Sequence, residues 1–149
     1  MVDPIAPTDV ARYPASTSFR LLFTDVDSLQ HVNNIALARY LAEARATFDA
    51  EVLGHDLVTE SAKGHAFVIA RVTIDYLHEA KHPGTVEVHT GCAGIGRTSF
   101  KLAQALIQHD RCVAVALTTL VHRQAGVPSP LPEAFRQRFA ERMMRDVSG

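Results

Sequence analysis

Apolar residues recur along this chain with two different spacings, which divide it into a helical and a strand-forming part. From residue 33 or 34 to residue 53 they recur every three to four positions, at Ile35, Ala38, Leu41, Ala42, Phe48 and Val52. This period predicts an amphipathic helix. Asn33 or Asn34 suits its N-cap, and Gly54 suits the position after its last turn. A helix of about 30 Å needs a broad apolar surface on which to lie.

The other apolar runs have the composition and alternation of β-strands. They cover residues 17–23, 66–77, 85–95, 99–109 and 112–122. The last run is almost entirely apolar, as in a strand that is covered on both faces. Polar and glycine-containing breaks separate the later runs by links of hairpin length, which favours an antiparallel sheet.

These elements predict an α+β fold in which one long helix packs across a five-stranded antiparallel sheet. Residues 1–15 contain three prolines and no sustained period, so we expect an extended N-terminal arm. Pro132 stands near the start of a short C-terminal helix. The length of 149 residues fits a single domain spanning 1–149.

Composition narrows the classes of function. Apolar residues make up 47% and charged residues 21% of the chain, which is ordinary for a globular protein. A net charge of -1 gives no electrostatic reason to expect nucleic acid or an anionic membrane as a partner. Cys92 and Cys112 form no CxxC pair, and the N-terminus lacks the features of a signal peptide. A reducing, cytoplasmic location with free thiols is therefore expected.

The loop before the long helix gathers the groups that could carry chemistry. Asp25, Asp27, His31, Asn33 and Asn34 fall within ten positions. The first N–H groups of a helix have no internal partner and carry partial positive charge, so they can hold a developing oxyanion. A carboxylate or a histidine beside such donors can serve as a general base or acid. The loop is therefore a candidate active site.

The segment DVDSLQHVNNIALARYLAEAR resembles the signature of acyl-CoA thioesterases related to 4-hydroxybenzoyl-CoA thioesterase. It is equally similar to the D-x-D-x-N-Q-H-V-N-N segment of plant acyl-ACP thioesterases. The resemblance implies a hot-dog fold, in which the sheet wraps the helix. It also implies hydrolysis of an acyl-CoA or acyl-carrier-protein thioester without a cofactor, by a homodimer or homotetramer.

The resemblance also implies roles for single residues. Asp27, the second carboxylate of the D-x-D pair, is the catalytic carboxylate. The backbone N–H near Asn34 polarises the thioester carbonyl. His31 matches the catalytic histidine of the plant branch, where it could orient water or protonate the product. Leu29 stands where the plant pattern has an asparagine, so the Asp-Asn-His arrangement does not carry over whole.

The stretch Gly94–Lys101 is the candidate for the CoA end of the substrate. Arg97, Thr98 and Ser99 could supply donors to phosphate there. The alternative is a polar hairpin with a glycine bulge.

Other interpretations stay open from the sequence. The loop carboxylates could bond only backbone N–H groups, Asn33 could be only a cap, and Glu43 on the helix is a rival catalytic carboxylate. The string His78-Glu79-Ala80-Lys81-His82 spells the H-E-x-x-H of zinc proteases, but it follows a strand and ends at a proline, so we expect a hairpin turn and no metal. A non-catalytic acyl-CoA or acyl-carrier binding module and a hot-dog dehydratase or hydratase remain as alternative functions.

Overall fold

The long helix forms where the apolar period predicts it. The computed structural model describes residues 3–54 and 57–146, and in it α1 spans Asn34–Leu53. The Asn33 side chain accepts a hydrogen bond from the Ala36 N–H at 2.8 Å, so it is the N-cap. Gly54 ends the helix in the left-handed region at φ 78°, which a glycine adopts without strain.

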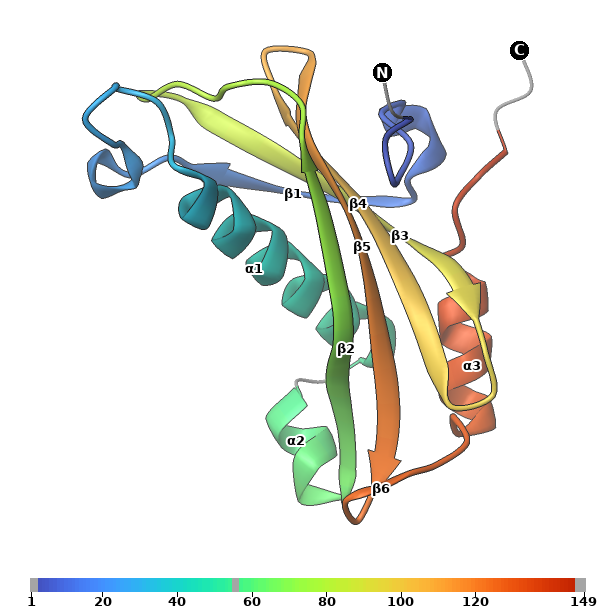
Figure 1. Ribbon diagram of the computed structural model, residues 1–149. Coiled ribbons are helices and arrows are strands. Elements are labelled where there is room, and N and C mark those ends of the chain that lie inside the picture. The colour runs from blue at the N-terminus through green and yellow to red at the C-terminus, as the bar shows by residue number, and fades with distance from the viewer. Residues whose placement is uncertain (1–2, 55–56, 147–149) are drawn as a thin grey trace.

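One antiparallel sheet curls around α1 (Figure 1). Its strands lie in the order β1-β3-β4-β5-β2, and a two-residue β6 pairs with the end of β5. Their bounds are Ala15–Arg20 for β1, His65–Tyr76 for β2, Thr85–Ile95 for β3, Ser99–Gln108 for β4, Arg111–Gln124 for β5 and Val127–Pro128 for β6. The helix lies across the concave face of the sheet, so the predicted hot-dog architecture is confirmed.

One expected link between strands was wrong. The turn at Pro83-Gly84 does not join a hairpin, because β2 pairs with β5 and β3 pairs with β1 and β4. Residues 77–84 instead lead from β2, at one edge of the sheet, past the N-terminus of α1 to the start of β3. This connection leaves β2 at an edge of the sheet and brings the His78–His82 string against the loop that precedes α1.

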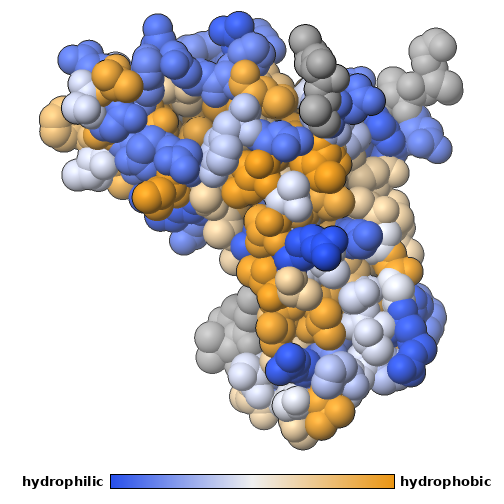
Figure 2. Space-filling model, in the orientation of Figure 1, coloured by the Kyte–Doolittle hydropathy of each residue, from blue (hydrophilic) through white to orange (hydrophobic). Residues whose placement is uncertain are grey.

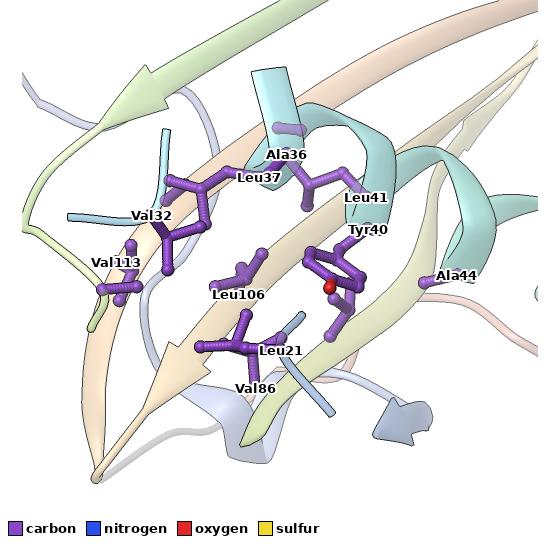
Figure 3. Close-up of a cluster of buried hydrophobic side chains, with 14 residues drawn as sticks. Leu21, Val32, Ala36, Leu37, Tyr40, Leu41, Ala44, Val86, Leu106 and Val113 are labelled. Atoms are coloured by element: carbon purple, nitrogen blue, oxygen red, sulfur yellow. The ribbon is translucent and has the colours of Figure 1, made fainter. Parts of the chain in front are cut away.

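Two apolar clusters fill the space between α1 and the concave face. The first surrounds the N-terminal half of the helix, where Leu37 and Leu41 meet Val86, Leu106 and Val113 from three strands (Figure 3). The second surrounds the C-terminal half and includes α3, which spans Glu133–Ala140. Burial of both clusters fixes the position of α1 and hence of the loop before it.

The N-terminal arm covers the convex face of the sheet. Ala6 and Tyr13 pack there against Ala103, Ala105 and Val115, and the Tyr13 hydroxyl donates to the Pro7 carbonyl at 2.6 Å. The arm is interrupted by a single turn of 3-10 helix at Val10–Arg12 and ends where β1 begins, at Ala15.

Some smaller features differ from expectation or complete the picture. A short helix α2, Leu57–Ala62, was not expected. Cys92 is buried and Cys112 half-buried, both as free thiols. No helix within residues 3–54 and 57–146 has the length and apolar character that a membrane crossing requires.

Candidate active site

The loop before α1 has an inner and an outer side, and Asp25 occupies the inner one. Asp25 is 1% exposed and ends a turn of 3-10 helix at Phe23–Asp25. Its Oδ1 lies 2.5 Å from Arg39 Nη2, and its Oδ2 accepts from the Tyr40 hydroxyl and from the Leu22 N–H. Burial by itself raises the pKa of Asp25, but the hydrogen bonds from Tyr40 and Arg39 outweigh burial and lower it. Asp25 is thus an ionised, fully partnered carboxylate that joins the loop to α1.

Asp27 lies on the outer side of the same loop and is exposed. Its Oδ1 accepts from the Leu29 N–H at 2.9 Å and from the His31 N–H at 3.3 Å, which is the Asx-turn arrangement. Its Oδ2 accepts no hydrogen bond from any described residue. The Asx-turn interpretation is therefore correct for one oxygen and leaves the other available to a ligand.

The loop holds Asp27 beside the start of α1. The Asp27 N–H donates to the His31 carbonyl at 3.0 Å, and the Asn33 N–H donates to the Asp25 carbonyl at 2.9 Å. Asn34 follows as the exposed first residue of the helix, whose N–H has no acceptor within the helix. The structure therefore gathers an open carboxylate oxygen and the positive end of a twenty-residue helix at one end of the molecule.

His31 is paired with the string that resembles a zinc-protease motif. Its Nε2 lies 3.1 Å from Glu79 Oε2, and its backbone forms a bridge to Lys81. The string is an irregular link and not a helix, so its two histidines do not share a helical face. No group of three or more metal-binding side chains exists among the residues that the structure describes. The string instead supports the outer loop through Glu79.

A cavity of about 470 Å³ opens at the outer side of the loop. Asp27 lines it together with Phe23, which is 82% exposed, and His82, whose ring meets that of Phe23 edge-on. Sequence reasoning missed Phe23 and His82 as parts of this site. Their signal is faint, because only the crossing of residues 77–84 brings His82 to the loop.

The other predicted residues lie elsewhere. Arg97, Thr98 and Ser99 lie at the turn between β3 and β4, where the Arg136 side chain donates to the Arg97 carbonyl at 3.2 Å. Since Thr85 at the start of β3 pairs with Arg20 near the loop, this turn lies roughly 30 Å away, at the far end of an eleven-residue strand. One chain does not bring the two groups together.

Two further carboxylates on α1 have opposite surroundings. Glu43 is exposed and has no ion pair among the described residues. Asp49 is 2% exposed, and its Oδ1 has no hydrogen-bonding partner among them. Burial raises the pKa of Asp49 to about 7, although the nearby charge of Arg45 opposes that rise. Asp49 was not singled out by sequence reasoning.

Residues 21–139 match the family model described as the Thioesterase-like superfamily. The chain belongs to this superfamily. No curated protein sequence matches it at the threshold applied. The matched range contains the loop, α1, β2 to β6 and all but the last residue of α3, so the superfamily assignment covers the candidate active site.

Solved structures of thioesterases share the fold of this superfamily member. A thioesterase from Thermus thermophilus, complexed with coenzyme A and Zn, is 29% identical over 91% of this chain and 98% of that one, with a TM-score of 0.78. A gentisyl-coenzyme A thioesterase is 22% identical over 84% and 99%, with a TM-score of 0.75. A 1,4-dihydroxy-2-naphthoyl-CoA thioesterase from Synechocystis is 16% identical over 85% and 95%, with a TM-score of 0.76. The last two likenesses concern the fold alone.

Proposed function

We propose that this thioesterase hydrolyses acyl-CoA, with Asp27 as the reacting carboxylate. The observation that carries the proposal is the open Oδ2 of Asp27 at a cavity on the loop that leads into α1. The carboxylate either attacks the thioester carbonyl, forming a mixed anhydride that water then hydrolyses to the free acid, or takes a proton from the water that attacks the carbonyl. The Asn34 N–H stabilises the oxyanion, the C–S bond breaks, and the thiolate of CoA leaves and is protonated.

His31 supports this site in the proposed mechanism. Its pairing with Glu79 fixes the ring at the outer side of the loop, while its backbone N–H orients Oδ1 of Asp27. A histidine held in this way can orient the attacking water or protonate the leaving thiolate.

The proposed enzyme is a homodimer joined along β2. One edge of this strand is unpaired among the described residues, and Val68, Ile69, Val72 and Tyr76 are each between 38% and 46% exposed. Figure 2 shows hydrophobic surface gathered along this strand. An exposed apolar edge favours pairing with an identical edge about a two-fold axis. The superfamily match supports the proposed reaction, thioester hydrolysis. The unpaired edge of β2 supports the proposed dimer, because it offers a surface to the second copy.

The dimer would also complete the substrate site. In a two-fold pair the two β2 strands run antiparallel, so the His65 end of one strand lies near the Tyr76 end of the other. The turn that carries Arg97, Thr98 and Ser99 lies at the same end of the sheet as His65, and Tyr76 bonds the Asn34 carbonyl. Each turn would therefore approach the loop of the other chain. We propose that it binds the phosphates of CoA there.

The role of Arg97 can be tested with kinetics. Arg97→Ala should raise KM for acyl-CoA more than it lowers kcat, because a contact remote from the reacting carbonyl contributes mostly uniform binding. Steady-state rates with one acyl-CoA measure both constants. An unchanged KM would remove Arg97 from the substrate site.

The reaction itself is tested by assaying free thiol release from a panel of acyl-CoAs, with and without EDTA. The proposal predicts release that EDTA does not reduce. Binding of acyl-CoA without thiol release would identify a non-catalytic binding module. Activity that is lost with EDTA and returns only with added zinc would contradict the assignment of the reaction to Asp27.

A further inference from the structure

A layer of polar side chains interrupts the apolar core beneath the middle of α1. Thr90, Gln104 and Thr118 lie on three neighbouring strands and are each at most 2% exposed. Arg45 on α1 contacts this layer through Thr118, and the buried Asp49 follows it one turn later on the helix. Buried polar groups normally have hydrogen-bonding partners, so any group in this layer that lacks one requires an explanation.

The layer has acceptors and donors that the described residues leave unused. Gln104 Nε2 donates to the Leu41 carbonyl at 2.9 Å and to Thr90 Oγ1 at 3.2 Å, while its Oε1 has no partner. Asp49 Oδ1 has none either. The half-buried guanidinium of Arg45 makes a single bond to these residues, from Nη1 to Thr118 Oγ1 at 3.3 Å. A guanidinium has five N–H donors, so most of those on Arg45 are free.

Arg45 lies along the line that leads away from the candidate active site. At the start of α1 the Asn34 carbonyl accepts from the Tyr76 hydroxyl at 3.1 Å, and farther along Arg45 bonds Thr118, which pairs with Val72. The first contact places the start of α1 against β2, and the second places Arg45 against β5, the strand that pairs with β2. The eleven residues from Asn34 to Arg45 correspond to about 16 Å along the helix, and the arginine side chain points back toward the N-terminus and shortens that gap.

The side chains between the candidate active site and Arg45 are small on α1 and apolar on β2. Ala38 and Ala42 precede Arg45 on the same helical face and are only half-buried. On the concave side of β2, Ile69 and Val72 are 46% and 43% exposed. An acyl chain that starts at the thioester carbonyl would therefore pass apolar side chains before it meets a free cationic donor.

We propose that Arg45 determines acyl specificity by binding a hydrogen-bond-accepting oxygen at the far end of the acyl group. This inference rests on the proposed thioesterase function. The oxygen can belong to a hydroxyl or to a carboxylate, since the guanidinium donates to both. A hydroxyl would also supply a donor for the unpartnered Oδ1 of Asp49. No hydrogen bond in the described structure joins Arg45 to Asp49, so Asp49 leaves the donors of the guanidinium available to a ligand.

Three substrates with equal chains test the inference. They are octanoyl-CoA, ω-hydroxyoctanoyl-CoA and the mono-CoA thioester of suberic acid, which differ only in the terminal group. For the wild-type protein we expect kcat/KM to be at least about tenfold higher for one of the two oxygenated substrates than for octanoyl-CoA, as a bond to a charged donor implies. The oxygenated substrate that is preferred identifies the terminal group.

Variants of Arg45 then separate binding from structure. Arg45→Met should reduce the ratio of kcat/KM between oxygenated and plain substrates to near one, and Arg45→Lys should restore part of it because a donor is kept. Arg111→Met, at the exposed first residue of β5, is the matched control and should leave the ratio unchanged. A structural role for Arg45 would change stability or all three rates together, without a change in the ratio.

The outcomes distinguish this inference from the function on which it rests. Thiol release from none of these substrates or of the wider panel would overturn the proposed function. Release from all three with equal efficiency, and a ratio that Arg45→Met does not alter, would overturn the role of Arg45 alone. If Arg45→Met does not fold, the ratios of Arg45→Lys and of the wild type decide the question.

Discussion

The inner and outer sides of the loop before α1 carry the same residue type with opposite surroundings. Asp25 on the inner side is buried and uses both oxygens to bind Arg39, Tyr40 and the Leu22 N–H. Asp27 on the outer side is exposed and keeps one oxygen open at a cavity. The two residues are separated by a single position. The number of satisfied oxygens, and not the residue type, therefore separates a structural carboxylate from a candidate reacting one.

The difference has a simple physical origin. The turn of 3-10 helix at Phe23–Asp25 directs the Asp25 side chain toward α1. Val26, which follows, is extended, so the Asp27 side chain points outward. An ionised carboxylate inside the protein requires donors, which α1 supplies through Arg39 and Tyr40. The loop and the helix are therefore fixed to each other by Asp25, while Asp27 stays free to meet a ligand.

Asp25→Asn breaks the inner side and should have the largest effect on stability. The variant loses the charge-assisted bond to Arg39 and weakens the one from Tyr40, so we expect the free energy of unfolding to fall by about 2 to 3 kcal/mol. Denaturant titration at pH 7 measures this loss.

The pH dependence of that loss gives its control. Because the folded pKa of Asp25 is lowered, its contribution is present above the unfolded pKa near 4 and disappears as pH falls through the lower, folded pKa. The difference between wild type and Asp25→Asn should therefore shrink in acid. A difference that stays constant into acid would show that the ion pair does not stabilise the loop.

Asp49→Asn replaces a buried carboxylate whose Oδ1, unlike the oxygens of Asp25, has no hydrogen-bonding partner among the described residues. Its folded pKa is about 7, above the unfolded value, so the native protein holds a proton that the unfolded chain has lost. The stability of the wild type should then fall, relative to the variant, by about 2 kcal/mol between pH 5.5 and 7. Thermal or denaturant unfolding across this range tests it, and parallel pH profiles would contradict it.

Glu43→Gln should have the smallest effect. Glu43 is exposed on α1 and bonds nothing among the described residues. We therefore expect kcat to stay within about twofold of the wild type, and the free energy of unfolding to stay within about 0.5 kcal/mol of it. Thiol release and a melting curve suffice to check both. A large loss of kcat would move the reaction from the loop to the helix.

The sequence predicted the elements well because their signals are local. The apolar period, the Asn33 cap and Gly54 define α1, and alternation defines the long strands. The sequence did not predict that β2 pairs with β5, since strand order depends on which apolar faces meet across the whole chain. The hairpin expected at Pro83-Gly84 failed for this reason, and His82 was missed as a lining residue with it.

The candidate site was predicted in part for the same reason. The density of polar groups and the motif resemblance singled out Asp27 and Asn34. Asp27 lines the cavity and Asn34 begins α1, and their catalytic roles stay predictions. The burial and full hydrogen bonding of Asp25 depend on side chains of α1 that lie more than ten residues farther along the chain. Asp49 lies between Phe48 and Val52 of the apolar pattern but is not part of it. The pattern therefore predicts that this carboxylate meets solvent, whereas in the structure its side chain is buried.

We propose that Asp27 is the reacting carboxylate of an acyl-CoA thioesterase. The most direct test compares kcat of Asp27→Asn with that of the wild type on one good substrate, alongside melting curves. An asparagine can still accept the Leu29 and His31 N–H bonds, so the fold should be kept. We predict a loss in kcat of at least about a hundredfold with an unchanged Tm. An active Asp27→Asn protein, beside an inactive Glu43→Gln protein, would contradict the account.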